Sequence, residues 1–418
     1  MEPGTRQPGL PFDQLSHDYL ALAFGLDQHI DGFIDAYSGP EAIRDRLVRA
    51  EPATPDGLLE QARALVGQVE DDDDLPTERR AFLLAQTRAM VALSERLAGA
   101  ELSYEDEVRR CFDVPAERTP EAAFDAALDD LDGALSGRGR EGDALNARMA
   151  EWKRGYVIEP EAARRLLDVI VPEIRARTRR LVELPEGESV AFQLVSDKPW
   201  SGYNWYLGGA RSLVEINTDL PIHVNTLTGL VCHEAYPGHH TEHTLKERRL
   251  FREREWGEFA VQLISTPQAV ISEGIATLAE SIVFPGDEAI RWQVAELYPV
   301  VGVTGDAERE IRIQRAQRVM RALSSNAALM LHVDGRSEDE VVVWLKRYGL
   351  RTEAEARHQL RFLTNPLWRA YVFTYHAGRD LLARWLEQGG PGTADDRFVR
   401  LLTTPTTPNG IRAEIERS

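Results

Sequence analysis

Histidines are concentrated in one short stretch of this chain. Five of the ten lie within 21 positions, and these are His223, His233, His239, His240 and His243. Several imidazoles that converge on one point can bind a metal ion or transfer protons near neutral pH. A histidine-rich exposed helix is the alternative interpretation. The concentration favours a functional cluster, and metal binding is the chemistry that suits it.

The His-Glu pair at positions 233 and 234 matches half of a zinc-protease motif. The usual form, H-E-x-x-H, places two imidazoles one helical turn apart with a glutamate base beside them. Here the residue four positions after His233 is Pro237, so the usual spacing is not met. Proline lacks an N–H group, and its ring clashes with the carbonyl of the residue four positions earlier. We therefore expect the helix to kink or break at Pro237-Gly238.

This break decides which histidine can join His233. In a straight helix, His240 would lie near the same face as His233 but about 10 Å further along the axis, and His239 would face elsewhere. A kink could bring either ring back, so the spacing leaves both open. A second ligand set needs no kink, because His239, Glu242 and His243 fit the inverted motif H-x-x-E-H. Such short patterns arise by chance in a histidine-rich stretch, and we rank this set second.

The elements that must position these residues are mostly helical. From Leu15 to about Leu181, apolar residues recur at three- and four-residue steps, which predicts helices. Between Glu188 and Asp219 apolar and polar residues alternate and glycines mark turns, which predicts two or three antiparallel strands. After Pro221 the helical pattern resumes and continues almost to the end. The expected helices are 222–250, 256–282, 287–300, 304–332, 337–348, 352–362 and 368–388.

The sequence thus predicts a mainly α fold, with a small antiparallel β-sheet before the histidine-rich helix. Residues 1–14, with Pro3, Pro8 and Pro11 and no periodicity, are expected to form a flexible lead. Residues 15–418 are expected to form a single helical catalytic unit. Its three parts are an N-terminal helical part (15–181), the small sheet (182–220) and a metal-site helical part (221–418).

Composition excludes several classes of function. The 418 residues include 49 Lys+Arg and 68 Asp+Glu, a formal net charge of −19. Non-specific binding to nucleic acid or to anionic lipid requires a basic face, so we expect neither partner. Two cysteines cannot form a disulfide framework or a cysteine-rich zinc site, and their scarcity suits a reducing compartment. No segment reads as a signal peptide or a transmembrane helix. We expect a cytoplasmic protein and leave its oligomeric state open.

The block H-E-x-x-P-G-H-H at His233–His240 resembles the signature of the bacterial domain-of-unknown-function family 885. That family is similar in its core to the thimet oligopeptidase and Taq carboxypeptidase metallopeptidases. Weaker matches to the same family occur along nearly the whole chain, in the order in which the family has them. They are the stretches 29–40, 104–108, 215–218, 272–280 and 375–378.

The resemblance implies a helical, metallopeptidase-like body and a zinc-dependent hydrolase with one Zn²⁺ ion. It favours His233 as the first ligand and Glu234 as the general base. It favours His239 as the second ligand, with His240 as the alternative, and Glu273 as the third. Considered alone, Ser272-Glu273 could simply start a helix, because acidic residues suit the first turn. Two histidines leave a zinc site one ligand short, so we favour ligation.

The resemblance also indicates donors for the oxyanion of the reaction. Tyr371, Tyr375 and His376 lie in a stretch that the related peptidases use for such donors, and we favour Tyr375 as a catalytic residue. The expected strand 211–217 could pair with an extended peptide substrate. Glu280 is expected to be a surface carboxylate, or else a support for the metal ligands.

Three classes of function are compatible with these residues. The first is a zinc peptidase or amidase acting on a peptide or small amide. The second is a metal hydrolase of a non-peptide amide or ester metabolite, and the third is a catalytically inactive binding protein. The presence of both Glu234 and Glu273 favours the first two, since a binding protein does not need an acid beside a metal-ligating histidine.

Overall fold

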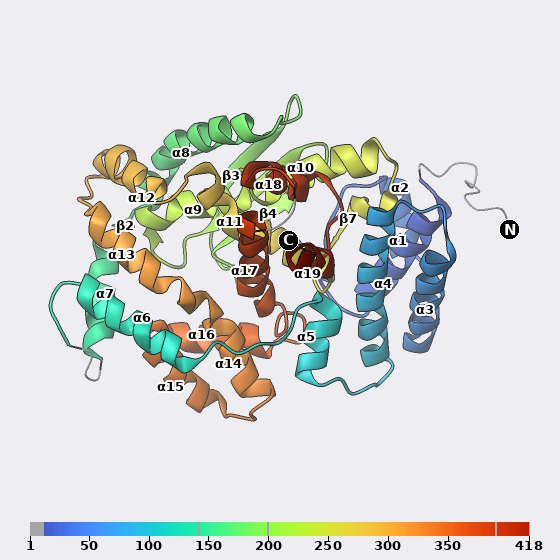
Figure 1. The fold of residues 1–418 in the computed structure, drawn as a ribbon, viewed down its shortest axis with the longest axis horizontal. Helices are drawn as coiled ribbons and strands as arrows, with labels where there is room; N and C mark the ends of the chain where they lie inside the picture. Colours follow the sequence, from blue (N-terminus) through green and yellow to red (C-terminus); the bar gives the residue numbers. More distant parts are fainter. Residues whose placement is uncertain (1–11, 140–142, 199, 389–390, 418) are drawn as a thin grey trace.

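The computed structural model describes residues 12–139, 143–198, 200–388 and 391–417 (Figure 1). The fold is mainly helical with small sheets, which confirms the predicted fold class. Most of the expected lead lies outside the described residues. The α-helices are α1 (Gln14–Asp27), α2 (Glu41–Val48), α3 (Pro55–Asp71), α4 (Thr77–Leu97), α5 (Tyr104–Phe112), α6 (Glu121–Ala134), α7 (Ala144–Arg154), α8 (Pro160–Leu181), α9 (Val224–Glu234), α10 (His239–Lys246), α11 (Pro267–Val283), α12 (Glu288–Trp292), α13 (Ala307–Gln317), α14 (Leu323–His332), α15 (Glu338–Gly349), α16 (Glu353–Thr364), α17 (Val372–Gln388), α18 (Ala394–Thr403) and α19 (Pro408–Arg417).

The strands form three small sheets. They are β1 (Ile34–Tyr37), β2 (Val157–Ile158), β3 (Ser189–Val195), β4 (Gly202–Tyr206), β5 (Arg211–Asn217), β6 (Ile222–His223) and β7 (Val261–Leu263). Short 3-10 and π-helical turns extend several helices, and the π-helical turn Glu247–Arg252 continues α10.

The sheet before the histidine-rich segment is mixed, so the expectation of an antiparallel sheet is wrong for one pair. The strand order is β3-β5-β4, with β4 antiparallel to β5 and β3 parallel to it. Successive strands reverse direction, and β3 pairs with the far edge of β5 instead of with β4, so β3 and β5 run the same way. Alternation of apolar residues is the same in both arrangements and does not reveal strand order.

Two further strand pairs lie where the sequence predicts helices. β1 pairs with β7, and β2 pairs with β6. The first pair falls within the expected helical regions 15–181 and 256–282, and β6 replaces the start of the expected helix 222–250. Each of these strands has two to four residues, and its partner is distant in the sequence. Tertiary pairing therefore overrides the local helical pattern.

Helices α11 and α17 pack side by side in the centre of the molecule (Figure 1). Their backbones approach closely, since a Cβ added at Gly378 would lie 2.4 Å from the carbonyl oxygen of Val270. Two clusters of buried apolar residues meet along this pair of helices. Val270 and Phe373 belong to one cluster, and Ile275 and Leu382 belong to the other.

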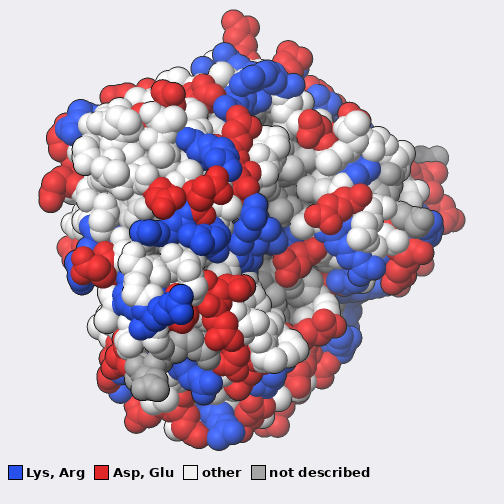
Figure 2. Space-filling view, turned by 60° about the vertical axis from the view of Figure 1, so that its left-hand side comes forward, with Lys and Arg blue, Asp and Glu red and all other residues white. Residues whose placement is uncertain are grey.

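The surface carries both signs of charge. Figure 2 shows basic side chains interspersed with acidic ones on one face of the molecule. Among the described residues, no single helix is long and apolar enough to cross a membrane. One pair of helical segments, Pro267–Val283 and Glu288–Val301, is long and apolar enough when the two are taken together. These two segments are bent by 60° relative to each other.

A buried ion pair fastens the N-terminal helices to the segment that precedes β7. Arg79 of α4 donates to Glu258 at 2.7 Å, and the side chains are 5% and 0% exposed. Arg79 also donates to Asp13, which caps α1. Because a buried charge without its partner is strongly unfavourable, this contact couples distant parts of the chain.

We predict that Arg79→Met lowers the free energy of unfolding by about 3–5 kcal/mol, because it leaves the Glu258 carboxylate buried and unpaired. Urea unfolding followed by circular dichroism measures the change. The control is Arg88→Met, which breaks an exposed pair with Glu70 and should cost less than about 1 kcal/mol. Equal losses in the two variants would contradict the prediction.

Candidate metal centre

The predicted break in the histidine-rich helix is confirmed. Helix α9 ends at Glu234, and α10 begins at His239 after a cis Tyr236–Pro237 peptide bond. The Gly238 N–H donates to the carbonyl of Cys232 at 3.0 Å, which folds the break back onto α9. A Cβ added at Gly238 would lie 1.9 Å from the His233 carbonyl oxygen. Only glycine therefore fits at this position.

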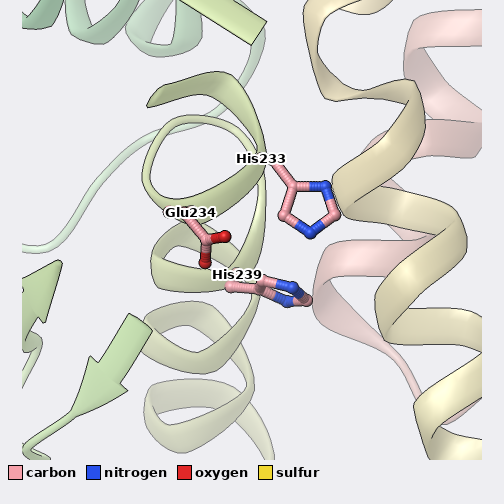
Figure 3. Close-up of side chains that lie close together, drawn as sticks. All are labelled: His233, Glu234 and His239. Carbon is pink, nitrogen blue, oxygen red and sulfur yellow. The ribbon is translucent and has the colours of Figure 1, made fainter. Parts of the chain in front are cut away.

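The break brings His233 and His239 together. Their ring centroids are 4.8 Å apart, and their planes are nearly perpendicular. Candidate ligand atoms of His233, Glu234 and His239 all lie within 4.8 Å of one another (Figure 3). Three residues that could hold a metal ion thus meet where α9 ends and α10 begins.

His240 faces away from this cluster. Its side chain is fully buried, with Nδ1 2.8 Å from the Ser212 hydroxyl and Nε2 3.2 Å from the Glu188 carboxylate. These contacts fix the ring beneath the β3-β5-β4 sheet. The structure thus places His239, and not His240, beside His233.

Glu273 reaches the same point from α11. Its Oε2 lies 3.5 Å from His233 Nε2, and its Oε1 lies 3.9 Å from His239 Nε2. The Tyr371 hydroxyl donates to Oε1 at 2.7 Å, whereas the buried Oε2 has no hydrogen-bond partner among the described residues. Since α11 begins at Pro267, Glu273 lies in its second turn, and the reading of Ser272-Glu273 as a helix start is wrong.

A chain of buried polar groups holds the His239 ring. His239 Nδ1 lies 3.1 Å from the Ser272 hydroxyl, which donates to Glu242 at 2.6 Å. Lys246 donates to the other oxygen of Glu242 at 2.5 Å. Because the hydroxyl proton is given to Glu242, Ser272 accepts from the Nδ1–H of His239, which leaves the Nε2 lone pair facing Glu273. Glu242 is thus linked through Ser272 to the Nδ1 side of the His239 ring, away from the Nε2 atom that faces Glu273. The ligand set of the inverted motif, His239, Glu242 and His243, is therefore not assembled.

The cluster faces a cavity of about 840 Å³. One aromatic wall comes from β4 and the residues before it, and the other from α16, α17 and the residues between them. The walls contain Trp200, Tyr203, Trp205, Phe362, Trp368, Tyr371 and Tyr375. The cavity is large enough for a short peptide segment and is open to solvent at its rim, where His358 and Arg361 are exposed.

The predicted oxyanion donors occupy different places. Tyr375 lines the cavity, with its ring 5.6 Å from that of Tyr371, and it is 37% exposed. Tyr371 is buried and engaged with Glu273. His376 is turned toward α14, where its Nδ1 lies 2.8 Å from the Ser325 hydroxyl. Tyr375 is therefore the most exposed of the three residues.

Burial controls the ionisation of this cluster. Burial raises the pKa of Glu234 to about 8, and the nearby charges of Glu273 and Asp35 add to the effect. Burial also raises the pKa of Glu273 to about 8, against the hydrogen bond from Tyr371. Burial, and then repulsion from His239, lowers the pKa of His233 to about 3. Burial, and then repulsion from His243, lowers the pKa of His239 to about 4. Neutral imidazoles are the form that binds metal ions.

Other predicted roles are corrected by the fold. Strand β5 (211–217) is central, with both edges paired, so it cannot add a peptide strand. β4 is one of the two edge strands of this sheet, and it lines the cavity. Glu280 is half-buried and faces Gly229 of α9, so it is not an ordinary surface carboxylate. Burial raises the Glu280 pKa, and Glu280 is not among the residues that line the cavity.

Sequence reasoning missed several residues of the site. It did not single out the support formed by Ser272 and Glu242, or the aromatic walls. It also missed Asp35, which lines the cavity and accepts a hydrogen bond from Tyr203. Asp35 lies in the stretch 29–40 that carries part of the family resemblance, and this was the only signal for it.

No protein-family model and no curated protein sequence matches this chain. Solved structures do match. A candidate lipoprotein from Colwellia psychrerythraea is 15% identical with a TM-score of 0.49, covering 87% of this chain and 70% of that protein. A candidate lipoprotein of unknown function from Shewanella oneidensis is 13% identical with a TM-score of 0.48, covering 95% and 82%.

An M32 carboxypeptidase from Deinococcus radiodurans R1 also matches. It is 14% identical with a TM-score of 0.34, and the match covers 93% of this chain and 88% of that protein. We carry no activity over from these three proteins at such low identity. The resemblance to family 885 stays a prediction from the motifs.

We predict that Gly238→Ala abolishes stoichiometric metal binding, because the new methyl group would overlap the His233 carbonyl and force the two imidazoles apart. Zinc content after dialysis in zinc-containing buffer measures the effect. Gly67→Ala in α3 is the control, since a Cβ there meets nothing within 4 Å. Full zinc retention in Gly238→Ala would contradict the prediction.

We predict that Ser272→Ala weakens zinc binding about 10- to 100-fold, because His239 loses the group that orients its ring. Competition with a chelator gives the dissociation constant. Ser281→Ala is the control on the same helix, where the hydroxyl donates only to the Leu278 carbonyl. Unchanged affinity in Ser272→Ala would show that the buried chain does not support the metal ligand.

Proposed function

We propose that this protein is a zinc-dependent hydrolase that cleaves the amide bonds of peptides or small amides. One observation carries the proposal: two imidazoles and two carboxylates, from His233, His239, Glu234 and Glu273, converge on one side of a substrate-sized cavity. A purely structural cluster would satisfy its buried polar atoms internally. Here Glu273 Oε2 has no hydrogen-bond partner among the described residues, which makes it available as a ligand for a cation.

The residues fit a zinc ion. Catalytic zinc sites commonly use three protein ligands from histidine and carboxylate side chains and leave one position open. We assign His233, His239 and Glu273 as the ligands. Glu234 is then the fourth group of the cluster, and its carboxylate has no hydrogen-bond partner in the described part of the chain. It is the group left free for proton transfer.

The chain's own residues supply the rest of the chemistry. Bound zinc would polarise the scissile carbonyl and lower the pKa of a water molecule. Glu234 takes a proton from the attacking water and gives it to the leaving nitrogen, so that water is added across the C–N bond. The Tyr375 hydroxyl donates to the carbonyl oxygen as negative charge develops on it.

The outer strand β4 is suited to hold an extended substrate. Its residues Gly202–Trp205 line the cavity, and Asn204 donates to the carbonyl of Glu234 at 2.5 Å, which fixes the strand to the end of α9. A peptide main chain that adds along β4 would pass in front of Glu234. This supports a peptide over a small non-peptide metabolite.

We also propose a cytoplasmic location with no nucleic-acid or membrane partner. The net charge of −19 supports the absence of these partners. The two cysteines, Cys111 and Cys232, are buried and free, which suits a reducing compartment.

We predict that Glu234→Gln keeps one zinc ion per chain and lowers amide hydrolysis about 10²- to 10⁴-fold, the usual contribution of a general base. Zinc analysis and a peptide-library digest read by mass spectrometry measure the two effects. His239→Ala should lose zinc. The matched control is His240→Gln, which should keep zinc because His240 faces Glu188.

Three outcomes would overturn this assignment. Wild-type protein without stoichiometric zinc under zinc-replete conditions would remove the metal from the proposal. Loss of zinc in Glu234→Gln together with retention in Glu273→Gln would exchange the roles of the two glutamates. Hydrolysis that resists chelators would point to a different mechanism.

A further inference from the structure

Asp35 is placed in the cavity by an irregularity in a strand. In the β1–β7 ladder, Ile34 pairs with Leu263 and Ala36 pairs with Gln262, so Asp35 is the extra residue of a bulge. A bulge re-aims the side chain of the residue it adds and often occurs beside an active site. Here the re-aimed carboxylate lines the cavity that contains His233 and Glu234.

The Asp35 carboxylate has a hydroxyl partner but no cationic one. The Tyr203 hydroxyl donates to its Oδ1, and no ion pair to Asp35 occurs within the described residues. Within the same part of the chain, Asp35 makes no hydrogen bond or ion pair with His233 or His239, whereas Glu273 approaches the Nε2 atoms of both rings. The metal site therefore does not account for this carboxylate.

Three carboxylates, those of Asp35, Glu234 and Glu273, line this one cavity. A single Zn²⁺ ion offsets two negative charges. Burial raises the pKa of Asp35 itself to about 6, so it carries its charge at neutral pH.

The surroundings of Asp35 suit an organic cation. The ring of Tyr203 lies 4.7 Å from that of Trp205 and 4.9 Å from that of Trp200, measured between centroids. Aromatic faces attract ammonium groups, and a carboxylate beside them adds a charge-assisted hydrogen bond. The combination of one uncompensated carboxylate and aromatic faces is typical of an amine-binding subsite.

We propose that Asp35 binds the protonated α-amino group of the substrate, so that the preferred substrates are peptides or aminoacyl amides with a free amine next to the amide that is cut. The inference rests on the proposed hydrolase function for the position of the cut. Asp35 lines the same cavity as Glu234 and Glu273, which supports an α-amino group, since only a few bonds separate that group from the reacting carbonyl.

Basic groups line the same cavity and need to be considered. They are Lys198, His358 and Arg361. His358 and Arg361 are exposed to solvent, and the Lys198 ammonium lies 5.2 Å from the centroid of the Trp200 ring. Water and salt screen charges at such a rim. These groups would attract the anionic carboxyl end of a peptide. The amino group at its other end would then bind beside Asp35.

Binding can be tested apart from hydrolysis. We would titrate zinc-loaded Glu234→Gln protein, in which the proposed hydrolysis is stopped, with L-leucinamide and with N-acetyl-L-leucinamide. Tryptophan fluorescence reports binding, because Trp200, Trp205 and Trp368 line the cavity. The free amine should bind at least about tenfold more tightly, since acetylation removes the charge.

The decisive variant is Asp35→Asn, which keeps an acceptor for Tyr203 but removes the charge. Added to the Glu234→Gln background, it should reduce the preference for the free amine at least tenfold and leave zinc content unchanged. Asp31→Asn is the matched control, because Asp31 is an exposed carboxylate four residues away. An unchanged preference in Asp35→Asn, or tighter binding of the acetylated ligand to the Asp35 protein, would overturn the inference.

Hydrolysis then separates this inference from the proposed function. With Glu234 present, kcat/KM for L-leucine p-nitroanilide should exceed that for its N-acetyl derivative, and Asp35→Asn should remove the difference. Equal rates for both substrates, unchanged in Asp35→Asn, would overturn the amine subsite and leave the hydrolase standing. Amine binding that depends on Asp35 without any hydrolysis would support the subsite and overturn the hydrolase.

Discussion

The contact between Gly238 and the end of α9 is the constraint on which the site depends. The backbone of Gly238 lies against the carbonyls of Cys232 and His233, at a distance that excludes any side chain. This contact folds α10 back toward α9. His239, six positions after His233, therefore lies beside the His233 ring. The same contact also sends the next histidine, His240, to Glu188 and the sheet. Of these two adjacent histidines, His239 therefore lies in the candidate site, and His240 contacts the residues that support it.

The same arrangement concentrates negative charge in a place that water reaches poorly. Glu234 and Glu273 come from helices that are far apart in the sequence, and Asp35 comes from a bulged strand on another side. The charge of Asp35 makes ionisation of Glu234 and of Glu273 less favourable, and the charge of Glu273 has the same effect on Glu234. A site with this excess of carboxylates favours cations, so the proposed metal binding and the proposed binding of a substrate amine would have one common electrostatic origin.

Much of the helical body could be predicted, because repeated apolar spacing carries that information over long segments. The break at Pro237 was also predictable, since it follows from the chemistry of one residue. Strand order was not, because the β3 pattern is the same whether the strand runs parallel or antiparallel to β5. The pairing of β1 with β7 depends on residues more than two hundred positions apart.

The candidate site shows the same division. The residue types and the resemblance singled out His233, Glu234, His239 and Glu273, but spacing alone could not choose between His239 and His240. The choice depends on backbone geometry at Gly238. Asp35 and Ser272 lie in stretches that carry the family resemblance, but they are common residue types, so only their positions in three dimensions reveal what they contact.

The close approach of α11 and α17 has a consequence for how this protein can be altered. The spacing between α11, which carries Glu273, and α17, which carries Tyr375, is set where Gly378 meets the backbone of Val270, and not by side chains that can repack. The aromatic walls on β4 and α16 lie outside this contact. The walls of the cavity can therefore be altered by substitution while the spacing between α11 and α17 stays the same, so the cavity's lining and this helix spacing can vary independently.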